Sequence, residues 1–390
     1  MAKRYRILFL RKGYITEPEC RRAFLDLGQS VESLTVTDYE PRHFLDLLVA
    51  RKAEYDFIFT INSYGFDEQG VVSATLRDEK IRVVSWEVDH PYFFYVFGKR
   101  TVFPGGYLVQ FVWDEGYIAD LHDRGFEQAY YLPNASSPQF VEAALQRPAP
   151  DDLTPERLRD KGTFVGTNLL DFIKTFLEEN LDFNLFPTDR HQQILDVLAR
   201  RLLGNTELSF PELFEQADEG HALSSMAESE KYRLIAELLV SSEYRTRILR
   251  SLPEISVYGG SEWENILAAG QYQRQLDYYS ETPHVYQNSA ININLTLTKN
   301  RFDSNQRIFD IPLCGGFLLT DRKRNLRRHF VEGEEMVSFG SVEELRELIS
   351  YYHNNPEQRS KITQRARERI LKEHTYKHRM RVMLDRLERL

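Results

Sequence analysis

Short apolar runs alternate with helical patterns over the first 135 residues of the chain. This alternation predicts βα units that assemble into a parallel sheet. The expected strands are residues 5–10, 31–36, 55–61, 81–86, 107–113 and 129–132. Between the first two, residues 18–27 have the spacing of a helix, and Gly28 is suited to cap its C-terminal end. We therefore expect a Rossmann-like domain over residues 1–145.

The composition changes after this first domain. Residues 146–160 begin with a stretch rich in Pro and Asp that has no periodicity, which is typical of a linker. Residues 169–252 then show helical periodicity with few glycines, so we expect a helical insert packed on the second domain rather than a part of a site. The βα pattern surrounds this insert, with expected strands at residues 162–166, 255–260, 290–295, 317–320 and 336–339.

The last part of the chain has helical patterns. Residues 341–353 are amphipathic, and residues 356–374 are amphipathic with a strongly basic outer side. The second domain is expected to span residues 161–375. The fold class that follows is α/β, with two Rossmann-like domains facing each other across a cleft and a helical insert in the second half.

Composition and charge narrow the classes of function. Hydrophobic residues make up 42% and charged residues 28%, and the net charge of -9 argues against a broad nucleic-acid-binding surface. No signal peptide precedes the first strand, and no apolar run reaches the roughly 20 residues that cross a bilayer. We expect a cytoplasmic protein without a transmembrane segment, and peripheral contact with a membrane stays compatible with the sequence. Cys20 and Cys314 match no zinc or redox spacing and are expected to be reduced.

Polar residues and glycines follow several of the expected strands. In open α/β sheets ligands bind beyond the carboxyl ends of the strands. Gly13, Asn62, Asp89 and His90 hold such positions in the first domain, and Gly259, in the strand expected at residues 255–260, is a candidate in the second. Asp89 and His90 are the candidates for a catalytic base. The alternative is that Asp89 caps the following segment and His90 is a packed residue.

The densest group of polar residues lies at 289–321. Its pattern predicts a buried strand, a polar loop, a short helix ended by Pro312, a glycine turn and another strand. Ser304 or Asn305 is suited to cap the helix, whose first backbone N–H groups would then be available to an anion. The alternative for Asn305 is a capping role alone.

Charged side chains in the same stretch indicate a nucleotide. Lys299, Arg301 and Arg307 add cations for a pyrophosphate, and Asp310 is placed to accept hydrogen bonds from both hydroxyls of a ribose. The alternative is that Asp310 only pairs with Arg307 at the surface. The candidate donor-binding residues are Gly13, Gly259, Asn294, Lys299, Arg301, Ser304, Asn305, Arg307 and Asp310.

Residues 286–379 resemble the C-terminal domain of the CgeB-like (spore-protein-type) glycosyltransferases. The matching segments are ININL (291–295), QRIFD (306–310), CGGFLLTD (314–321) and EHTYKHR (373–379). The first half also resembles the domain that accompanies it, through SWEVDHP (85–91), WD (113–114) and YLPNA (131–135). One departure is Asp310, where related enzymes usually carry the longer Glu.

The resemblance implies a GT-B fold and a glycosyltransferase. A nucleotide-sugar donor, linked to UDP, dTDP or GDP, would bind the second domain, and a protein or surface-glycan acceptor would bind mainly the first. Asp89 and His90 would supply the base, while Asn62, Tyr64 and Tyr92 would contact the acceptor. Residues 376–390 would form a helix that packs back on the first domain.

Cofactor use and the competing functions also follow from these patterns. No Asp-x-Asp pair suited to a divalent metal stands out, so we expect no cofactor and a metal-independent reaction that relies on protein cations. A nucleotide-sugar epimerase or phosphorylase of the same shape is one alternative. A scaffold that binds a nucleotide sugar without catalysis is another.

Overall fold

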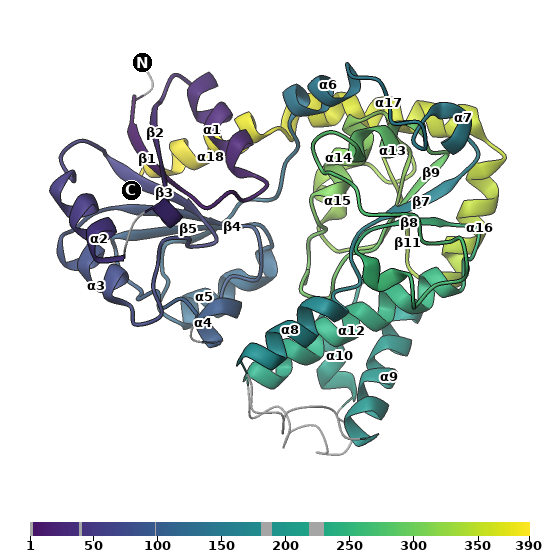
Figure 1. Cartoon of the computed structure of the whole chain (residues 1–390), viewed down its shortest axis with the longest axis horizontal. Coiled ribbons are helices and arrows are strands. Elements are labelled where there is room, and N and C mark those ends of the chain that lie inside the picture. Colours follow the sequence, from purple (N-terminus) through teal and green to yellow (C-terminus); the bar gives the residue numbers. More distant parts are fainter. Residues whose placement is uncertain (1–2, 39–40, 98, 181–188, 218–229) are drawn as a thin grey trace. The chain divides into compact units, whose positions relative to one another are not determined.

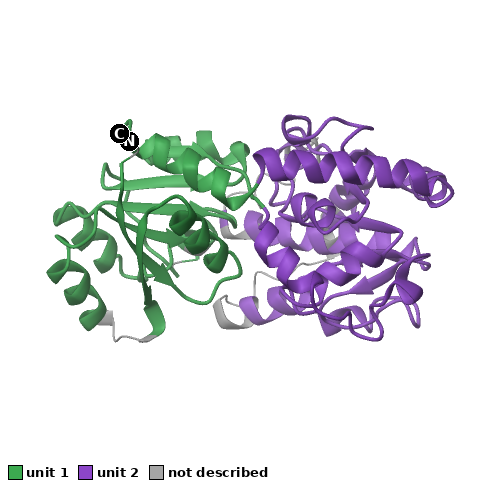
Figure 2. Ribbon diagram, turned by 90° about the horizontal axis from the view of Figure 1, so that it is seen from above, with its two compact units in different colours: residues 1–135, 375–390 green, residues 136–374 purple. Residues whose placement is uncertain are grey.

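The chain forms two compact units in a computed structural model that describes residues 3–38, 41–97, 99–180, 189–217 and 230–390. The first unit contains residues 1–135 and 375–390, and the second contains residues 136–374 (Figure 2). The division after residue 135 precedes the boundary expected at 145. The reason is that α6 (Pro138–Leu145) packs on α13 (Thr282–Asn288), and its Val141 belongs to a core of the second unit.

The first unit is built on a six-stranded sheet in the order β2-β1-β3-β4-β5-β6. Every neighbouring pair of strands is parallel. The strands are β1 (Arg6–Arg11), β2 (Ser30–Thr35), β3 (Phe57–Ile61), β4 (Val83–Glu87), β5 (Leu108–Val112) and β6 (Ala129–Tyr131). Side chains of β3, β4 and β5 are buried at every position, because helices cover both faces of a parallel sheet.

Helices lie on both faces of this sheet. One face packs through Phe9, Phe59 and Trp86 against α1 and α18. The other packs through Leu8 and Ile58 against α2 and α3. The helices are α1 (Glu17–Asp26), α2 (Pro41–Ala50), α3 (Val71–Asp78), α4 (Phe93–Val96), α5 (Ile118–Asp123) and α18 (Tyr376–Leu387).

The C-terminal helix α18 belongs to the core of the first unit, where it lies beside α1 (Figure 1). Its Tyr376, Met380 and Met383 are buried in the same cluster as Trp86. Arg379 donates from Nε to Pro133 O at 2.8 Å and from Nη2 to Asn134 O at 2.9 Å. These bonds fix the start of α18 to the segment that leaves β6.

The second unit is built on a five-stranded sheet in the order β11-β10-β9-β7-β8. Its neighbouring strands are also parallel. The strands are β7 (Gly162–Val165), β8 (Ser256–Tyr258), β9 (Ile291–Asn294), β10 (Leu318–Asp321) and β11 (Val337–Phe339). The remaining helices are α7 (Pro155–Leu158), α8 (Leu170–Asn180), α9 (Asp189–Gly204), α10 (Phe210–Ala217), α12 (Glu230–Arg250), α14 (Arg307–Leu313), α15 (Leu326–His329), α16 (Val342–His353) and α17 (Pro356–Glu373).

The two faces of this second sheet carry different helices. Helices of the expected insert, α9, α10 and α12, pack with α16 on one face. Helices α14 and α17 pack on the other. Residues 181–188 and 218–229 of the expected insert lie outside the described residues. The segment expected as a linker contains α7, and its Leu153 and Leu158 are buried against Tyr258 and Val285.

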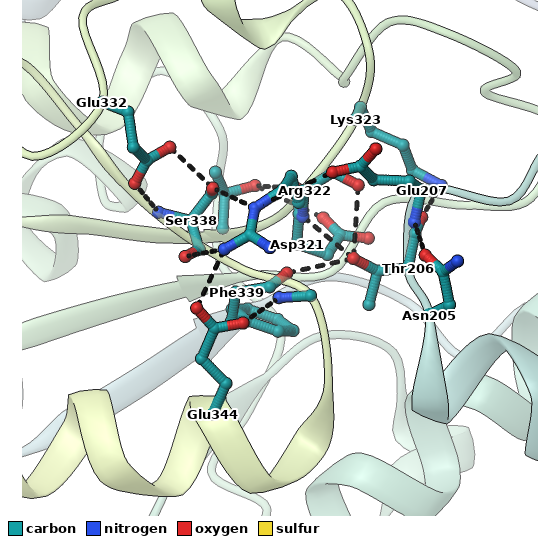
Figure 3. Close-up of polar contacts among 12 residues, drawn as sticks. Asn205, Thr206, Glu207, Asp321, Arg322, Lys323, Glu332, Ser338, Phe339 and Glu344 are labelled. Carbon is teal, nitrogen blue, oxygen red and sulfur yellow. Dashed lines mark hydrogen bonds and ion pairs between the residues drawn. The ribbon is translucent and has the colours of Figure 1, made fainter.

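A turn of the insert is fastened to the ends of β10 and β11 (Figure 3). Arg322 N donates to Thr206 Oγ1 at 3.1 Å, and this hydroxyl lies 3.0 Å from Phe339 O. Lys323 Nζ donates to Thr206 O at 3.0 Å. The insert is therefore tied to the carboxyl edge of the sheet, where a ligand of an open α/β sheet binds.

Candidate functional site

Asp310 lies in α14 of the second unit, and three side chains contact its carboxylate. Ser136 Oγ donates to Oδ1 at 2.5 Å, and the Tyr278 hydroxyl donates to Oδ2 at 2.9 Å. Gln306 Nε2 lies 3.5 Å from Oδ1. The two closest donors are hydroxyl groups. The two hydroxyl groups of a ribose could donate to the same carboxylate oxygens in place of Ser136 and Tyr278.

Burial dominates the ionisation of Asp310. It raises the pKa of the carboxyl to about 6, although hydrogen bonds from Ser136, Tyr278 and Gln306 and the charge of Arg307 act in the opposite direction. Ionising a carboxyl group in this buried environment costs free energy. Hydrogen-bond donors supplied by a ligand would therefore stabilise the carboxylate form more than the same donors would in water.

Asn294, Ser304 and Asn305 lie together and hold the loop between β9 and α14. Asn305 Nδ2 donates to Asn294 Oδ1 at 3.1 Å, and Asn294 Nδ2 donates to Thr320 Oγ1 at 3.0 Å. Ser304 Oγ and Thr296 Oγ1 are 2.9 Å apart. These bonds connect the loop to the ends of β9 and β10 and so place the residues that follow.

The start of α14 differs from the expectation of amides available to an anion. Asn305 Oδ1 accepts from Arg307 N at 3.1 Å, and Asn305 O accepts from Ile308 N at 3.4 Å. Gln306 O accepts from the next two amides. Because local groups already bond these amides, positive side chains are the better candidates for binding phosphate. The short helix expected to end at Pro312 ends one residue later, at Leu313.

Two guanidinium groups lie near the carboxyl ends of β7 and β9. Arg307 Nη2 would be 3.3 Å from a Cβ added to Gly166, the residue after β7. Arg245 of α12 is 2% exposed and donates to Thr167 O at 2.8 Å and to Leu295 O at 2.7 Å. Burial and then repulsion by Arg307 lower the pKa of Arg245 to about 9, against the attraction of Asp321. This concentration of buried positive charge suits an anionic ligand.

Lys299 and Arg301 lie in the β9–α14 loop near Glu237 of α12. Burial raises the pKa of Glu237 to about 7, and the charges of Arg301 and Lys299 oppose this rise. Thr298, the residue before Lys299, donates to Glu237 O at 2.6 Å and fastens the loop to α12. The helical insert therefore positions both expected cations.

The two candidate glycines have different surroundings. A Cβ at Gly259 would be 2.2 Å from Gly166 O, so this glycine permits close approach of the ends of β8 and β7. Gly13 has φ of +87° and lies in the first unit, where its N–H donates to Glu17 Oε2 at 3.0 Å. The structure therefore separates Gly13 from the other candidate donor-binding residues by unit and gives its amide an internal acceptor.

Asp89 of the first unit is positioned by residues that follow β1 and β3. Tyr14 donates to Asp89 Oδ2 through its hydroxyl, and Asn62 Nδ2 donates to the same oxygen at 2.9 Å. Asn62 Oδ1 accepts from Val88 N and Asp89 N. Asn62 has φ of 52°, a conformation that non-glycine residues adopt rarely and that clusters at functional sites.

The other candidates of the first unit pack against charged or aromatic groups. Tyr64 lies below the Arg100 guanidinium, which is 4.2 Å from the ring centroid. His90 is 8% exposed, and its ring meets Tyr92 and Tyr117 edge to face at centroid distances of 4.5 and 4.8 Å. The structure thus brings Asn62 and Asp89 into direct contact, and it packs the ring of His90 against that of Tyr92. Of the two candidate bases, Asp89 is the more accessible to solvent.

Sequence reasoning missed several residues at these sites. Ser136 and Tyr278 contact Asp310 from distant parts of the chain, and no local pattern marks them. Arg245 lay inside the segment interpreted as a packed helical insert. Gln110 was detectable as the one polar residue of the buried strand β5, and Glu87 was detectable together with Ser85 as the polar residues of the buried strand β4.

Neither a metal cluster nor a membrane helix is found in the described residues. Within these ranges, no three or more His, Cys, Asp or Glu side chains are grouped to hold a metal ion. None of the described helices is both long and apolar enough to span a bilayer.

Comparisons with known proteins identify the fold. Residues 245–385, less than half of the chain, match a family model described as glycosyl transferase-like. A search among curated proteins finds no match. Among solved structures, Anabaena Alr3699/HepE in complex with UDP-glucose is 12% identical, with a TM-score of 0.54 over 99% of this chain and 100% of that one. Sucrose-phosphate synthase from Thermosynechococcus elongatus is also 12% identical, with a TM-score of 0.52 over 99% of this chain and 98% of that one.

At these identities the structural likeness concerns the fold, and it confirms the two Rossmann-like α/β domains that the sequence predicted. The family match covers the segment that contains Asp310 and Arg307, and it relates this segment to glycosyl transferases. The chain therefore has the GT-B fold, and its residues 245–385 are similar to a glycosyl transferase-like family.

Proposed function

We propose that the protein is a glycosyltransferase of the CgeB-like type that takes its sugar from a nucleoside-diphosphate donor. The observation that carries this proposal is the buried Asp310 carboxylate, held by two hydroxyl groups within the segment that matches the glycosyl transferase-like model. A solved structure of similar fold, Anabaena HepE, contains UDP-glucose, which is consistent with a donor of this class.

The donor would bind at the carboxyl edge of the second sheet. Asp310 would accept hydrogen bonds from the ribose hydroxyls in place of Ser136 and Tyr278. Arg307 and Lys299 would contact the diphosphate, and Arg301 would add to the positive potential there. Asn294, Ser304 and Asn305 would hold the loop that carries these cations, and Gly259 would keep the strand ends close together.

The reaction breaks the bond between the anomeric carbon and a diphosphate oxygen. A bond forms between the same carbon and an acceptor oxygen or nitrogen, the electron pair of the broken bond leaves with the diphosphate, and the acceptor loses a proton. We assign this proton to Asp89, with His90 as its neighbour in the chain. Tyr14 and Asn62 orient the Asp89 carboxylate for that role.

The acceptor is proposed to be a protein or a surface glycan. Tyr64 and Tyr92 would lie against it, since aromatic rings offer apolar faces to sugars and peptides. The positive groups of the donor site would stabilise the leaving diphosphate without a metal ion. Transfer that continues unchanged in EDTA supports this part of the proposal, and transfer restored only by a divalent cation contradicts it.

Thermal unfolding with nucleotides tests the donor site. UDP, GDP and dTDP would each be titrated against the wild-type chain, and binding to the folded state is expected to raise the melting temperature with concentration for at least one of them. Asp310→Ala is expected to abolish that rise. Asp277→Ala, at an exposed carboxylate of the same unit, is the matched control and should retain it.

Either of two results would contradict the proposal. A melting temperature that no nucleotide changes would remove the donor site. Wild-type nucleotide affinity in Asp310→Ala would remove Asp310 from it. Release of free sugar from the donor would then separate a transferase from a protein that only binds nucleotide.

A further inference from the structure

A pocket of about 200 Å³ lies within the first unit beside β4 and β5. Residues from separate segments line it, including Ser63 after β3, Glu87 at the end of β4, Gln110 in β5 and Arg124 after α5. All of these segments belong to residues 1–135, so the pocket is formed by one unit. Only Asn62, Asp89, His90 and Tyr92 of the sequence candidates also line it.

The floor of the pocket is a polar patch on an otherwise apolar face of the sheet. Val83 and Leu108 occupy this face near the start of β4 and β5 and pack in the core that includes α2 and α3. Two positions further along each strand the same face carries Ser85 and Gln110, which are register partners. Glu87 follows two positions after Ser85. The face therefore changes from apolar to polar toward the carboxyl ends of the strands.

The acidic group of this floor is bonded within the protein. Ser63 Oγ donates to Glu87 Oε1 at 2.7 Å, and Ser85 Oγ donates to the same oxygen. Burial raises the pKa of Glu87 above its usual range, so this floor carries less negative charge than an exposed carboxylate.

The amide oxygen of Gln110 is the unusual atom of the floor. Gln110 is 3% exposed, and no polar atom in the described part of the chain pairs with its Oε1. Buried amide oxygens are nearly always hydrogen-bonded, since an unmade bond there costs free energy. Gln110 thus lines the pocket with a buried acceptor that the described protein groups do not satisfy, and a ligand that brings a donor, such as a hydroxyl group, would complete its hydrogen bonding.

The residues on the walls of the pocket indicate which class of ligand it can bind. Tyr95, Phe103 and Phe126 are aromatic lining residues, and Arg100 and Arg124 also line the pocket. Their two positive charges outnumber the Asp89 carboxylate, which lines the pocket beside the hydrogen-bonded Glu87, so the pocket does not favour an amine. A ring with hydroxyl groups on its edge and C–H groups on its faces matches both the acceptor floor and the aromatic walls.

We propose that this pocket binds a hexose unit of a glycan acceptor, whose hydroxyl groups donate to Gln110 Oε1 and to the Glu87 carboxyl. The binding of the sugar follows from the pocket alone. Its role as acceptor rests on the glycosyltransferase function proposed above. Among the acceptor classes considered, this assigns a glycan rather than a peptide.

Saturation-transfer NMR on the full chain tests the binding. The probes are the methyl glycosides of glucose, galactose and N-acetylglucosamine, and a serine-containing tripeptide amide serves as the competing class. At least one glycoside is expected to bind, and removal of one hydroxyl in its deoxy analogues is expected to weaken binding by about tenfold. A tripeptide that binds while the glycosides do not would overturn the proposal, as would an absence of binding by every glycoside.

A pair of matched variants tests the residue. Gln110→Met keeps the length of the side chain and removes the amide, so it is expected to weaken glycoside binding by about tenfold without lowering the melting temperature. Gln29→Met is the control, because Gln29 is also buried but accepts from Tyr5 N at 2.8 Å and donates to Leu27 O at 2.9 Å. It should lower the melting temperature and leave glycoside binding unchanged.

The outcomes separate this inference from the proposed function. Glycoside binding of equal strength in Gln110→Met would overturn the assignment of Gln110. Should that variant fail to fold, the deoxy analogues measured on the wild-type chain still decide the hydroxyl contact. UDP titration of the same samples reports on the donor site independently. Binding of glycosides without binding of UDP would refute the transferase function and retain the sugar pocket. Binding of UDP without binding of any glycoside would refute the sugar pocket alone.

Discussion

Asp310→Asn should change the pH dependence of stability, because burial separates the folded and unfolded pKa values of this carboxyl. In the folded chain the pKa is raised from 3.8 to about 6. The folded state therefore binds the proton more tightly than the unfolded state, and the free energy of unfolding falls as the pH rises through this window. Asparagine does not titrate, so the variant lacks this contribution at every pH.

The magnitude follows from the two pKa values. Between pH 5 and pH 8 the wild-type chain loses about 1.4 kcal/mol of unfolding free energy through this carboxyl. The amide also loses hydrogen bonds from Ser136 and Tyr278, but that cost is the same at both pH values. The difference between variant and wild type should thus move in favour of the variant by about 1.4 kcal/mol from pH 5 to pH 8.

Urea unfolding of both proteins at the two pH values measures this difference by linear extrapolation. Asp277→Asn is the control, because hydrogen bonds from Ser280 lower the pKa of Asp277. Its carboxyl is ionised in the folded and the unfolded state at both pH values, so the difference between this variant and wild type should stay constant. A difference for Asp310→Asn that stays constant with pH, or moves against the variant, would refute the view that burial outweighs the hydroxyl donors.

Three further changes test other parts of the structure. Gly259→Ala should lower the free energy of unfolding, measured by chemical denaturation, by about 2 kcal/mol or more, because the added Cβ would be 2.2 Å from a backbone oxygen. Gly204→Ala is the control: no atom lies within 4 Å of its added Cβ, so its free energy of unfolding should change by less than about 0.5 kcal/mol. Arg245→Met should lower it by about 2 kcal/mol through loss of donors to two carbonyl groups and should weaken UDP binding in calorimetry; unchanged UDP affinity would exclude a contribution to the phosphate site. Tyr14→Phe should slow sugar transfer to acceptor by about tenfold with less than 1 kcal/mol change in stability, because it removes one hydrogen bond that orients Asp89; an unchanged kcat would argue against Asp89 as the base.

The strands were predictable because both sheets are parallel and their central strands are buried on both faces. Most strands are short apolar runs with turn residues after them, and the structure has strands at every expected range, including the more exposed edge strand β2. β9 lies within the expected residues 290–295, and β10 overlaps the expected residues 317–320 but ends one residue later, at Asp321. The helices of the insert were recognisable for the same reason, since their apolar spacing reflects packing on one face of the second sheet.

The sequence was sufficient to place part of the candidate donor site, but it did not identify every residue that contacts Asp310. Arg307 and Asp310 are close in the chain, and local spacing placed them on one short helix. Ser136 is 174 positions from Asp310, so their contact depends on tertiary structure that no local pattern encodes. The expected anion site at the start of α14 was wrong in its local chemistry, because Asn305 and Gln306 use the amides as internal donors.

The path of the chain also bears on how the protein is made. Residues 376–387 complete the core of the first unit, which otherwise consists of residues from the first part of the chain. During synthesis these early residues leave the ribosome long before Tyr376 and Met380 exist, so the apolar surface that α18 covers stays exposed while the whole second unit is translated. The helix that closes the first unit is therefore made after the whole second unit, and chaperones have a defined interval in which to bind that surface.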